Sequence, residues 1–325
     1  MQPKRCLRRH PRKTIAGLLS LALIAAWLTG DFVYSFRVAR AVKAWEATQT
    51  RDESGVIEGA QAFSMGEGET AILLVHGINA SPCIWRNIAP ALAAEGFAVR
   101  AMRLPGFAEP MSQYAAATKE DWLAAVDEEV ARLRESHPRV ILVGHSLGGA
   151  ITIAYSLQHP KAVDALVLLA PAVEVSSERS PVLPVRCWHE FARWTLAFTW
   201  LTESPFEPDC HDPAGRVFVG QSPFTPVATV DETFAVIDHN RVRATEISVP
   251  LLMFVAEEDP AVDTLAARRY FDAAGSEWKR LIVLDESGHL IPVDYQWRLV
   301  VTQMRDFLSR MGGTPRANHS EDHRG

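Results

Sequence analysis

A serine stands between two glycines in the segment Gly144-His145-Ser146-Leu147-Gly148. The segment follows an apolar run over 140–144 and precedes a helical pattern that begins at 147. A serine at a sharp turn between a strand and a helix projects from the turn, at the positive end of the helix dipole. The glycines allow the tight turn and keep side chains away from the serine. The pattern therefore predicts that Ser146 is the nucleophile of an acyl-transfer reaction.

A nucleophilic serine needs a base. Of the eleven histidines, His289 has the most suitable position, because it lies in Ser287-Gly288-His289, just after the last apolar run at 281–285. The other histidines lie in the terminal tails, in turns, at helix ends or in a long insertion. Loops at the carboxyl ends of parallel strands are where such sites assemble. We therefore expect His289 to be the base.

The base in turn needs a carboxylate that orients it. This carboxylate is expected after the apolar run at 251–256, where several acidic residues compete. Asp259, in Asp259-Pro260-Ala261-Val262, is the preferred candidate, and Glu258 and Asp263 are the alternatives.

Acyl transfer also needs two N–H donors that face the developing oxyanion. The segment His76-Gly77-Ile78-Asn79 follows the apolar run at 71–75. The backbone N–H groups of Ile78 and Leu147 are the natural pair. His76 itself precedes the turn, so a structural role is favoured for it.

The body of the chain alternates short apolar runs with helical patterns. Continuous apolar runs are typical of strands that are buried on both faces. The expected strands are 71–75, 98–102, 140–144, 165–170, 251–256 and 281–285. The expected helices are 84–95, 119–136, 147–159, 263–274 and 293–311. This alternation predicts an α/β fold, with a mostly parallel sheet covered by helices on both faces.

The segment from about 171 to 249 is far longer than an ordinary connection and is rich in aromatic residues. Trp188, Phe191, Trp194 and Phe198 follow helical spacing and predict one apolar helix face. We expect a helical cap whose aromatic residues pack a small core and line a pocket. Cys187 and Cys210 lie in this cap, and both a disulfide and two free thiols are compatible with the sequence. Cys83 is expected to be a buried small apolar residue.

The N-terminus has the pattern of a membrane segment. Residues 1–13 carry six basic residues and no acidic one, and the uncharged run 14–30 follows. As a helix this run spans about 25 Å, and with the aromatic-rich extension to 36 it matches a hydrocarbon core of about 30 Å. The positive-inside rule then puts the body on the non-cytoplasmic, periplasmic or extracellular side. We expect residues 1–36 to form a transmembrane signal anchor, with a cleaved signal peptide and a secreted body as the alternative.

Two further segments frame the body. Residues 37–59 are predicted to be a helical continuation or a linker, and 312–325 to be a disordered tail, because that segment has almost no apolar residues.

Beyond residue 13 the chain carries 27 basic and 39 acidic residues, a net charge of −12, which makes it a poor nucleic-acid binder. The four cysteines show no C-x-x-C spacing, so a zinc ribbon is not expected, and the chemistry inferred above requires no metal and no cofactor.

Over roughly 60–311 the chain resembles the α/β-hydrolase superfamily, in which the triad follows the order of Ser146, Asp259 and His289. The body looks most like the bacterial carboxylesterase and monoacylglycerol-lipase group with a small helical cap. The segments that carry the resemblance are 74–78, 119–122, 144–149, 258–260 and 287–289. The resemblance implies a serine hydrolase that forms an acyl-enzyme on Ser146.

The expected reaction is cleavage of carboxylic esters with short- to medium-chain acyl groups, or of monoacylglycerols. The alternatives on the same scaffold are a thioesterase, an amidase, a carbon–carbon hydrolase and a cofactor-free perhydrolase. Haloalkane dehalogenases and epoxide hydrolases of this fold would need a carboxylate at position 146, and a serine stands there. From a different class, a catalytically inactive, membrane-tethered binding protein remains an alternative, although no triad member is missing.

Overall fold

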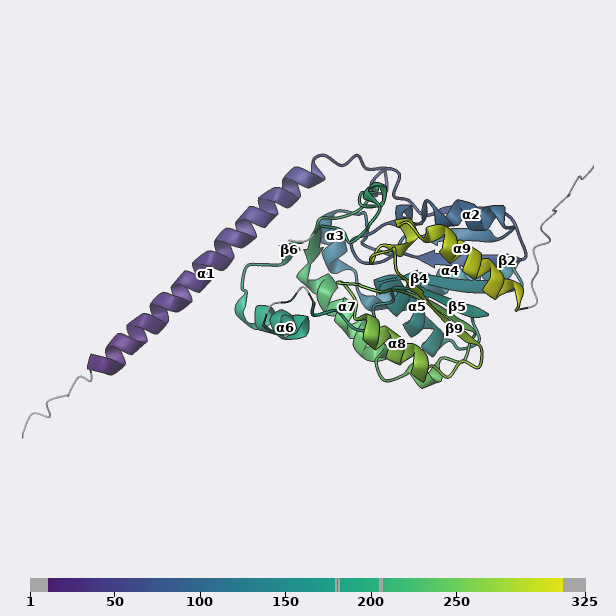
Figure 1. Cartoon of the computed structure of the whole chain (residues 1–325). Coiled ribbons are helices and arrows are strands. Elements are labelled where there is room, and N and C mark those ends of the chain that lie inside the picture. Colours follow the sequence, from purple (N-terminus) through teal and green to yellow (C-terminus); the bar gives the residue numbers. More distant parts are fainter. Residues whose placement is uncertain (1–10, 179, 181, 205–206, 312–325) are drawn as a thin grey trace, which may run out of the picture.

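The computed structural model describes residues 11–311, except 179, 181, 205 and 206 (Figure 1). Most of the basic start of the chain and the expected tail at 312–325 lie outside the described residues. The described body consists of a central sheet with helices on both faces, a cap inserted after the fifth strand, and one long helix that projects from the body.

The central sheet has seven strands in the order β1-β3-β2-β4-β5-β8-β9. All neighbouring strands pair in parallel except β1, which runs antiparallel to β3 at the edge. The strands are β1 (Phe63–Met65), β2 (Thr70–Val75), β3 (Ala98–Met102), β4 (Arg139–His145), β5 (Ala165–Leu169), β8 (Leu251–Ala256) and β9 (Lys279–Leu284). Every residue of β2, β5 and β8 is buried, which confirms that the apolar runs are strands covered on both faces.

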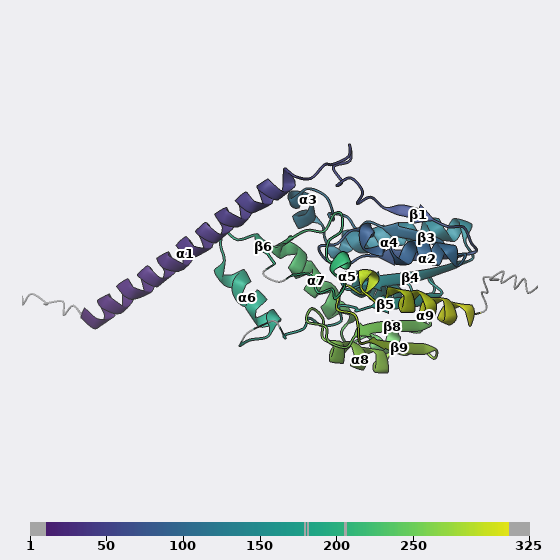
Figure 2. The same ribbon diagram turned by 45° about the horizontal axis from the view of Figure 1, so that its top comes forward.

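Helices cover both faces of this sheet, as Figure 2 also shows. On one face α2 packs against α9, and on the other α4 and α5 pack together. The helices of the body are α2 (Ile88–Ala94), α3 (Met111–Ala116), α4 (Lys119–Ser136), α5 (Leu147–Gln158), α8 (Thr264–Ala273) and α9 (Trp297–Ser309). The helix expected at 119–136 has those bounds, because Thr118 and Asp121 form a capping box at its start.

Two expected helices are shorter than the apolar pattern suggests. The first turn of 84–95 belongs to a separate 3₁₀ turn at Pro82–Trp85, capped by Ser81, and α2 begins only at Ile88. Near the C-terminus a second 3₁₀ turn at Ile291–Val293 contains Pro292, and α9 begins at Trp297. Pro90 lacks an N–H and is tolerated only in the first turn of a helix, so α2 begins just before it. Asp294 has an extended backbone and separates the second 3₁₀ turn from α9.

The cap contains two helices and a small sheet. It comprises α6 (Val185–Thr195), the antiparallel pair β6 (Leu201–Glu203) and β7 (Phe224–Pro226), and α7 (Val227–Asn240). The predicted aromatic face of the first cap helix includes Trp188, Phe191 and Trp194, but Phe198 lies beyond the end of α6. The cap cysteines are free thiols: Cys187 is exposed on α6 and Cys210 is buried, so the disulfide that the sequence allowed is not formed.

The N-terminal helix α1 (Pro11–Glu46) runs without a break through the first part of the segment expected to be a helix or linker. Its residues 15–46 form a helix that is long and apolar enough to cross a membrane, by length and composition only. Most of it projects away from the body (Figure 1). Near its C-terminal end, Val38 and Val42 are buried in the hydrophobic core, so this end is fixed to the body.

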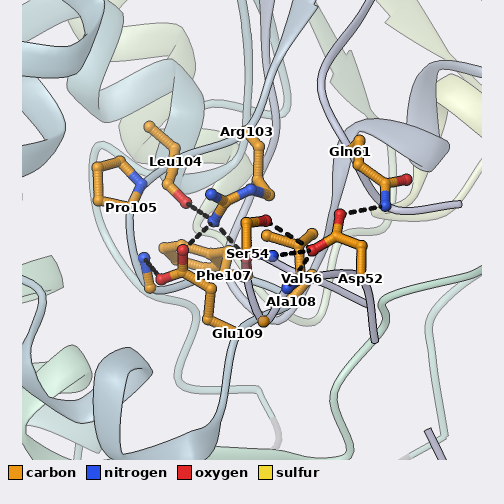
Figure 3. Close-up of polar contacts among 12 residues, drawn as sticks. Asp52, Ser54, Val56, Gln61, Arg103, Leu104, Pro105, Phe107, Ala108 and Glu109 are labelled. Atoms are coloured by element: carbon orange, nitrogen blue, oxygen red, sulfur yellow. Dashed lines mark hydrogen bonds and ion pairs between the residues drawn. The ribbon is translucent and has the colours of Figure 1, made fainter. Parts of the chain in front are cut away.

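The segment after α1 is tied to the loop that follows β3 (Figure 3). The Asp52 carboxylate accepts hydrogen bonds from the backbone N–H groups of Ser54 and Val56 and from the Gln61 side chain, and so closes a turn. The N–H of Ile57 donates to the carbonyl of Ala108 at 2.9 Å. The segment is thereby attached to the neighbouring loop through its backbone.

That loop is held in shape by Arg103. Its guanidinium donates to the carbonyl of Phe107 at 3.0 Å and lies 2.9 Å from the Glu109 carboxylate, which also accepts the N–H of Gly106 at 2.8 Å. The loop carries the ring of Phe107, which packs against His76 at the end of β2. The loop therefore supports the end of the strand from which the candidate oxyanion segment begins.

Candidate active site

Ser146 occupies a strained turn between β4 and α5. Its φ of 54° and ψ of −119° lie in a region that residues with a side chain seldom adopt. The backbone packs closely at the two glycines that flank it. A Cβ at Gly144 would lie 2.4 Å from the carbonyl oxygen of Gly148, and one at Gly148 would lie 2.3 Å from that of Val75. Glycine is therefore required at both positions, and the turn points Ser146 toward the loops at the carboxyl ends of the strands.

The structure brings the three predicted triad residues together. Ser146 Oγ lies 3.0 Å from His289 Nε2, and His289 Nδ1 lies 2.8 Å from Asp259 Oδ2. The three side chains follow three different strands, β4, β8 and β9, and meet at one edge of the sheet. All three residues are buried, and this burial strengthens each electrostatic contact by excluding water.

Asp259 is the acidic residue after β8 that faces the histidine. Its Oδ1 accepts the N–H groups of Ala261 and Val262, at 2.8 and 3.0 Å. Burial alone would raise its pKa, but the charge of His289 and the hydrogen bonds from His289, Val262 and Ala261 outweigh burial, so the pKa is lowered. The carboxylate therefore stays ionised.

The two alternative acids lie elsewhere. Glu258 is exposed, and Asp263 caps the start of α8 by accepting the N–H of Ala266 at 2.8 Å.

The backbone of His289 is fixed by side chains from two other parts of the chain. The carboxylate of Asp209, from the cap, accepts the N–H of His289 at 2.6 Å. His145 Nε2 lies 2.9 Å from the carbonyl oxygen of His289, and because a carbonyl only accepts, this nitrogen carries the proton. Burial and the neighbouring charge of His289 lower the pKa of His145 to about 3, so its ring is neutral.

Asp294 holds the same loop through hydrogen bonds to its backbone. It is fully buried, and its two oxygens accept four backbone N–H groups at 2.8–2.9 Å, those of His211, Asp212, Gly288 and Tyr295. It thereby joins the loop of His289 to the cap segment at 211–212. Neither Asp209 nor Asp294 was singled out from the sequence, because no local pattern marks an acid that binds backbone 80 residues away.

The two predicted oxyanion donors, Ile78 and Leu147, both border the cavity beside Ser146. Leu147 is the first residue of α5, so its N–H has no acceptor within the helix. The turn after Ile78 is held at Asn79, which has a φ of 54°. Its side chain accepts from the Tyr114 hydroxyl at 2.9 Å and donates to Thr225 of the cap at 2.6 Å.

His76 has the structural position that the sequence favoured. Its Nε2 accepts the N–H of Leu104 at 3.1 Å, so its proton lies on Nδ1, which donates to the carbonyl of Gly77 at 3.0 Å. Burial lowers the pKa of His76 to about 4, and the ring is neutral.

A cavity of about 500 Å³ lies above Ser146, between the sheet and the cap. Most of its lining is apolar, with Ala172, Val175, Val230, Phe234 and Val262 among the residues that form it. Such a volume is within the range of roughly 300–1,000 Å³ that is typical of small-molecule sites. Within the described residues there is no group of three His, Cys, Asp or Glu side chains that could hold a metal ion.

An α/β-hydrolase fold with a serine at the turn after the central strand defines a serine hydrolase of the carboxylesterase and lipase kind. Residues 66–296 match the family model described as Hydrolase_4, serine aminopeptidase S33, and the chain belongs to this family.

Named relatives agree with this class. The chain is 24% identical over 258 residues to a thermostable monoacylglycerol lipase of Bacillus sp. (strain H-257), covering 79% of this chain and 98% of that protein. It is 22% identical over 250 residues to a carboxylesterase of Bacillus subtilis (strain 168), covering 77% of this chain and 96% of that protein.

Solved structures share the fold. One of the structures reported for the metagenome-derived lipolytic enzymes LipS and LipT matches with a TM-score of 0.70 at 22% identity, over 78% of this chain and 99% of that one. The monoacylglycerol lipase of Paleococcus ferrophilus matches with a TM-score of 0.63 at 20% identity, over 76% of this chain and 98% of that one. In both cases the unmatched part of this chain is about a quarter of its length.

Proposed function

We propose that the chain cleaves carboxylic esters through an acyl-enzyme on Ser146, with His289 as the base and Asp259 as its orienting carboxylate. The observation that carries the proposal is the chain of two hydrogen bonds, 3.0 and 2.8 Å long, that links the three side chains beside an apolar cavity. Nucleophile, base and orienter at these distances are what covalent acyl transfer requires.

The reaction has two displacements. His289 Nε2 takes the proton of Ser146 as Oγ attacks the ester carbonyl, and then gives it to the leaving alcohol when the carbon–oxygen bond breaks. A water molecule, deprotonated by the same nitrogen, attacks the acyl-enzyme and releases the acid. Asp259 keeps the proton on Nδ1 and stabilises the imidazolium that forms in each half. The N–H groups of Ile78 and Leu147 hold the oxyanion of both tetrahedral intermediates.

The substrate class follows from the cavity. An apolar lining favours an acyl chain, and a volume of about 500 Å³ suits short- to medium-chain acyl esters or monoacylglycerols. The names of the two bacterial relatives, a monoacylglycerol lipase and a carboxylesterase, support this class.

The proposed location is a membrane, with α1 as an uncleaved anchor. The helix has the length and composition for a span, and the basic flank before it favours a cytoplasmic N-terminus, with the catalytic body on the other side. Mass spectrometry of the protein from the membrane fraction is expected to give the mass of the full-length chain. The mass of a chain that has been cleaved after residue 36 would instead favour a secreted protein.

Hydrolysis of p-nitrophenyl esters of graded acyl length, and of monoacylglycerols, tests the proposed reaction. The detergent-solubilised full chain is compared with Ser146→Ala and with Ser64→Ala, a matched change at an exposed serine of the edge strand β1. We expect Ser146→Ala to lose activity by about 10³-fold or more and to lose labelling by a fluorophosphonate, while Ser64→Ala retains both.

The panel also distinguishes other reactions of the scaffold. Thioesters and aminoacyl p-nitroanilides are included, because the family description names an aminopeptidase. A folded protein that the fluorophosphonate labels, but that prefers one of these to every ester, would contradict ester cleavage and retain the nucleophile. A folded protein with neither activity nor labelling would contradict both.

A further inference from the structure

Helix α6 of the cap has its polar side toward the protein. Arg186 contacts the carboxylates of Glu174 and Asp238 at 2.8 and 2.9 Å, and His189 contacts Asp231 at 2.7 Å. Asp231 and Asp238 belong to α7, the cap helix that packs on the body. These charged contacts attach α6 to the rest of the molecule. In a water-soluble protein, an amphipathic helix would instead pack its apolar stripe against the core.

The apolar side of α6 faces outward instead. None of its eleven residues is buried. The large side chains on this side are exposed by 41% (Trp188), 48% (Phe191) and 84% (Trp194). Leu183, Phe198 and Trp200, before and after the helix, are exposed as well. We call these six residues the cap apolar surface. An exposed group of large apolar side chains, rich in tryptophan and phenylalanine, is typical of a site that meets another apolar phase.

The cap is joined to α1 through a buried carboxylate. Asp31 is only 5% exposed although it follows the long uncharged run of α1. It accepts the N–H groups of Ala197 and Phe198 at 2.7 and 2.9 Å and the hydroxyl of Thr199 at 2.6 Å. Three donors that converge on one carboxylate fix the loop after α6 to a single position along α1.

Other contacts surround this carboxylate within the same stretch of α1. Trp27 Nε1 donates to the carbonyl of Thr195 at 2.9 Å, and Ser35 Oγ donates to that of Phe198 at 2.7 Å. The ring of Trp27 also packs edge-on against that of Phe191, with centroids 5.8 Å apart. Both views place α6 beside α1 and apart from the central sheet (Figures 1 and 2). The cap therefore contacts α1 between residues 27 and 37.

This stretch of α1 is where a spanning helix would leave the hydrocarbon. The uncharged residues 14–30 span about 25 Å as a helix, slightly less than a hydrocarbon core of about 30 Å, so the boundary lies near Asp31. Arg37, Arg40 and Lys43 follow on the far side. In a chain whose α1 spans the membrane, the contacts with the cap would hold α6 at the level of the bilayer surface.

We propose that α1 and the cap act as one membrane-binding unit, in which Asp31 holds the cap so that the cap apolar surface lies in the interface of the bilayer that α1 spans. An amphipathic helix with tryptophan and phenylalanine on its apolar side is suited to that interface. The cavity above Ser146 reaches this helix, because Val185, the first residue of α6, lines it. Provided that the proposed ester cleavage holds, a lipid-like ester enters the cavity from the bilayer and not from water.

A fluorescent reporter on α6 tests the docking without any assay of activity. Cys187 is exposed on α6, and replacing Cys6 and Cys83 by serine leaves it as the one accessible thiol beside the buried Cys210. The full-length protein, labelled there with an environment-sensitive nitrobenzoxadiazole, is reconstituted into phosphatidylcholine vesicles that contain nitroxide-labelled lipid. The matched control carries the label on Ser136→Cys, at the end of α4, with Cys187 replaced by serine.

We expect the label at 187 to shift its emission to the blue and to be quenched by the nitroxide lipid, and the label at 136 to show neither effect. Equal quenching at the two positions, or none at 187, overturns the proposal. A blue shift at 187 that is not quenched by the lipid and disappears on dilution of the protein also overturns it, because a second copy of the chain would then cover the surface.

Asp31→Leu tests the link between the anchor and the cap. The change removes the acceptor for three donors while making the span more apolar, so the helix stays inserted; Ser20→Leu, at an exposed position of the same helix, is the matched control. Asp31→Leu is expected to reduce quenching at 187, and to lower the ratio of hydrolysis of vesicle-borne monoacylglycerol to that of a water-soluble ester by about fivefold or more.

Two results of that comparison count against the link. Quenching at 187 that survives Asp31→Leu overturns the role of Asp31, even if the surface docks. An unchanged hydrolysis ratio, with quenching lost, overturns entry of substrate from the bilayer. Absence of hydrolysis in every variant is a failure of the proposed ester cleavage alone, since the quenching experiment still reports on docking.

Discussion

The catalytic histidine proposed for this chain depends on two carboxylates that bind the backbone of its loop and not its imidazole ring. Asp209 accepts the N–H of His289, Asp294 accepts that of the preceding Gly288, and His145 Nε2 donates to the carbonyl of His289. A histidine on a loop of this kind has no regular secondary structure to fix it, so these contacts replace the missing backbone partners. The arrangement also couples the site to the cap, because Asp209 and residues 211–212 belong to the inserted segment.

Replacing Asp294 by asparagine is expected to destabilise the fold and to slow catalysis. The amide NH₂ of asparagine would face N–H donors that now meet a carboxylate oxygen, and each charge-assisted hydrogen bond contributes about 1.5–3 kcal/mol. We expect the free energy of unfolding to fall by about 2–4 kcal/mol. We also expect kcat for a soluble ester to fall more than KM rises, since His289 is displaced while the acyl cavity is retained.

Thermal unfolding and ester kinetics in the same detergent check this expectation. Asp285→Asn is the control, because Asp285 is exposed and accepts a hydrogen bond from the Gln296 side chain, and a change within about 0.5 kcal/mol is expected for it. Equal stability of the two variants would show that the four N–H groups find other acceptors.

At the scale of elements, the strands were the most predictable feature and the cap was the least. Strands such as 98–102 and 251–256 have the expected bounds, because a strand buried on both faces must be a continuous apolar run. β1 was not predicted, because its three residues at the sheet edge are exposed or half-exposed and carry no such pattern. The cap pairing of β6 with β7 depends on residues more than twenty positions apart, which local periodicity cannot reveal.

In the candidate site, too, the residues marked by local sequence patterns could be predicted, and those that depend on distant contacts could not. Ser146, Asp259 and His289 could be predicted because each lies in the short segment that follows a strand, and the carboxyl ends of parallel strands meet at one edge. The positions of Asp209 and Asp294 could not, because their partners are fixed only after the cap has folded. The orientation of α6 was also missed, since its spacing predicts an apolar face but does not say which side meets the protein.

The polar attachment of α6 has a measurable consequence for its local stability. Arg186 contacts two carboxylates and lies 4.5 Å above the ring of Phe234, whereas Arg193, on the same side, is half exposed and its contacts are 3.3 and 3.5 Å long. We expect Arg186→Ala to open α6 more easily by about 1–2 kcal/mol, which is about a 5- to 30-fold faster hydrogen exchange of its amides. Arg193→Ala is the matched control and should change exchange less, because exposed pairs contribute little.

Hydrogen–deuterium exchange followed by mass spectrometry measures both variants in detergent. The amides of α5 are expected to keep their protection in each case, because every residue of that helix except the last is buried. Equal exchange in Arg186→Ala and the unmodified chain would mean that the contacts with α1, and not those with α7, hold α6.

At the scale of the whole molecule, two buried neutral histidines connect the fold to pH. His76 and His145 flank the turn of Ser146 from β2 and β4, and burial lowers their pKa values to about 4 and about 3. In the unfolded chain a histidine has a pKa of about 6.5. Between pH 6.5 and about 4 the unfolded state therefore binds protons that the folded state does not.

The sign of the pH effect follows from this difference. The stabilisation from both histidines is fully present above pH 6.5 and is lost as the pH falls toward 4. Each contributes a slope of up to about 1.4 kcal/mol per pH unit. The lowered pKa of Asp259 adds a further loss only below its ordinary value near 3.8, outside this window.

Melting temperatures of the detergent-solubilised chain between pH 7.5 and 4.5 should therefore fall steadily below pH 6.5. His145→Gln separates the two histidines, because its Nε2 can still donate to the carbonyl of His289 but cannot titrate, and it should remove about half of the slope. A variant with an unchanged slope would assign the acid sensitivity to other groups. A uniformly lower melting temperature would mean only that the glutamine fails to replace the hydrogen bond, so the comparison depends on the slope and not on the absolute stability.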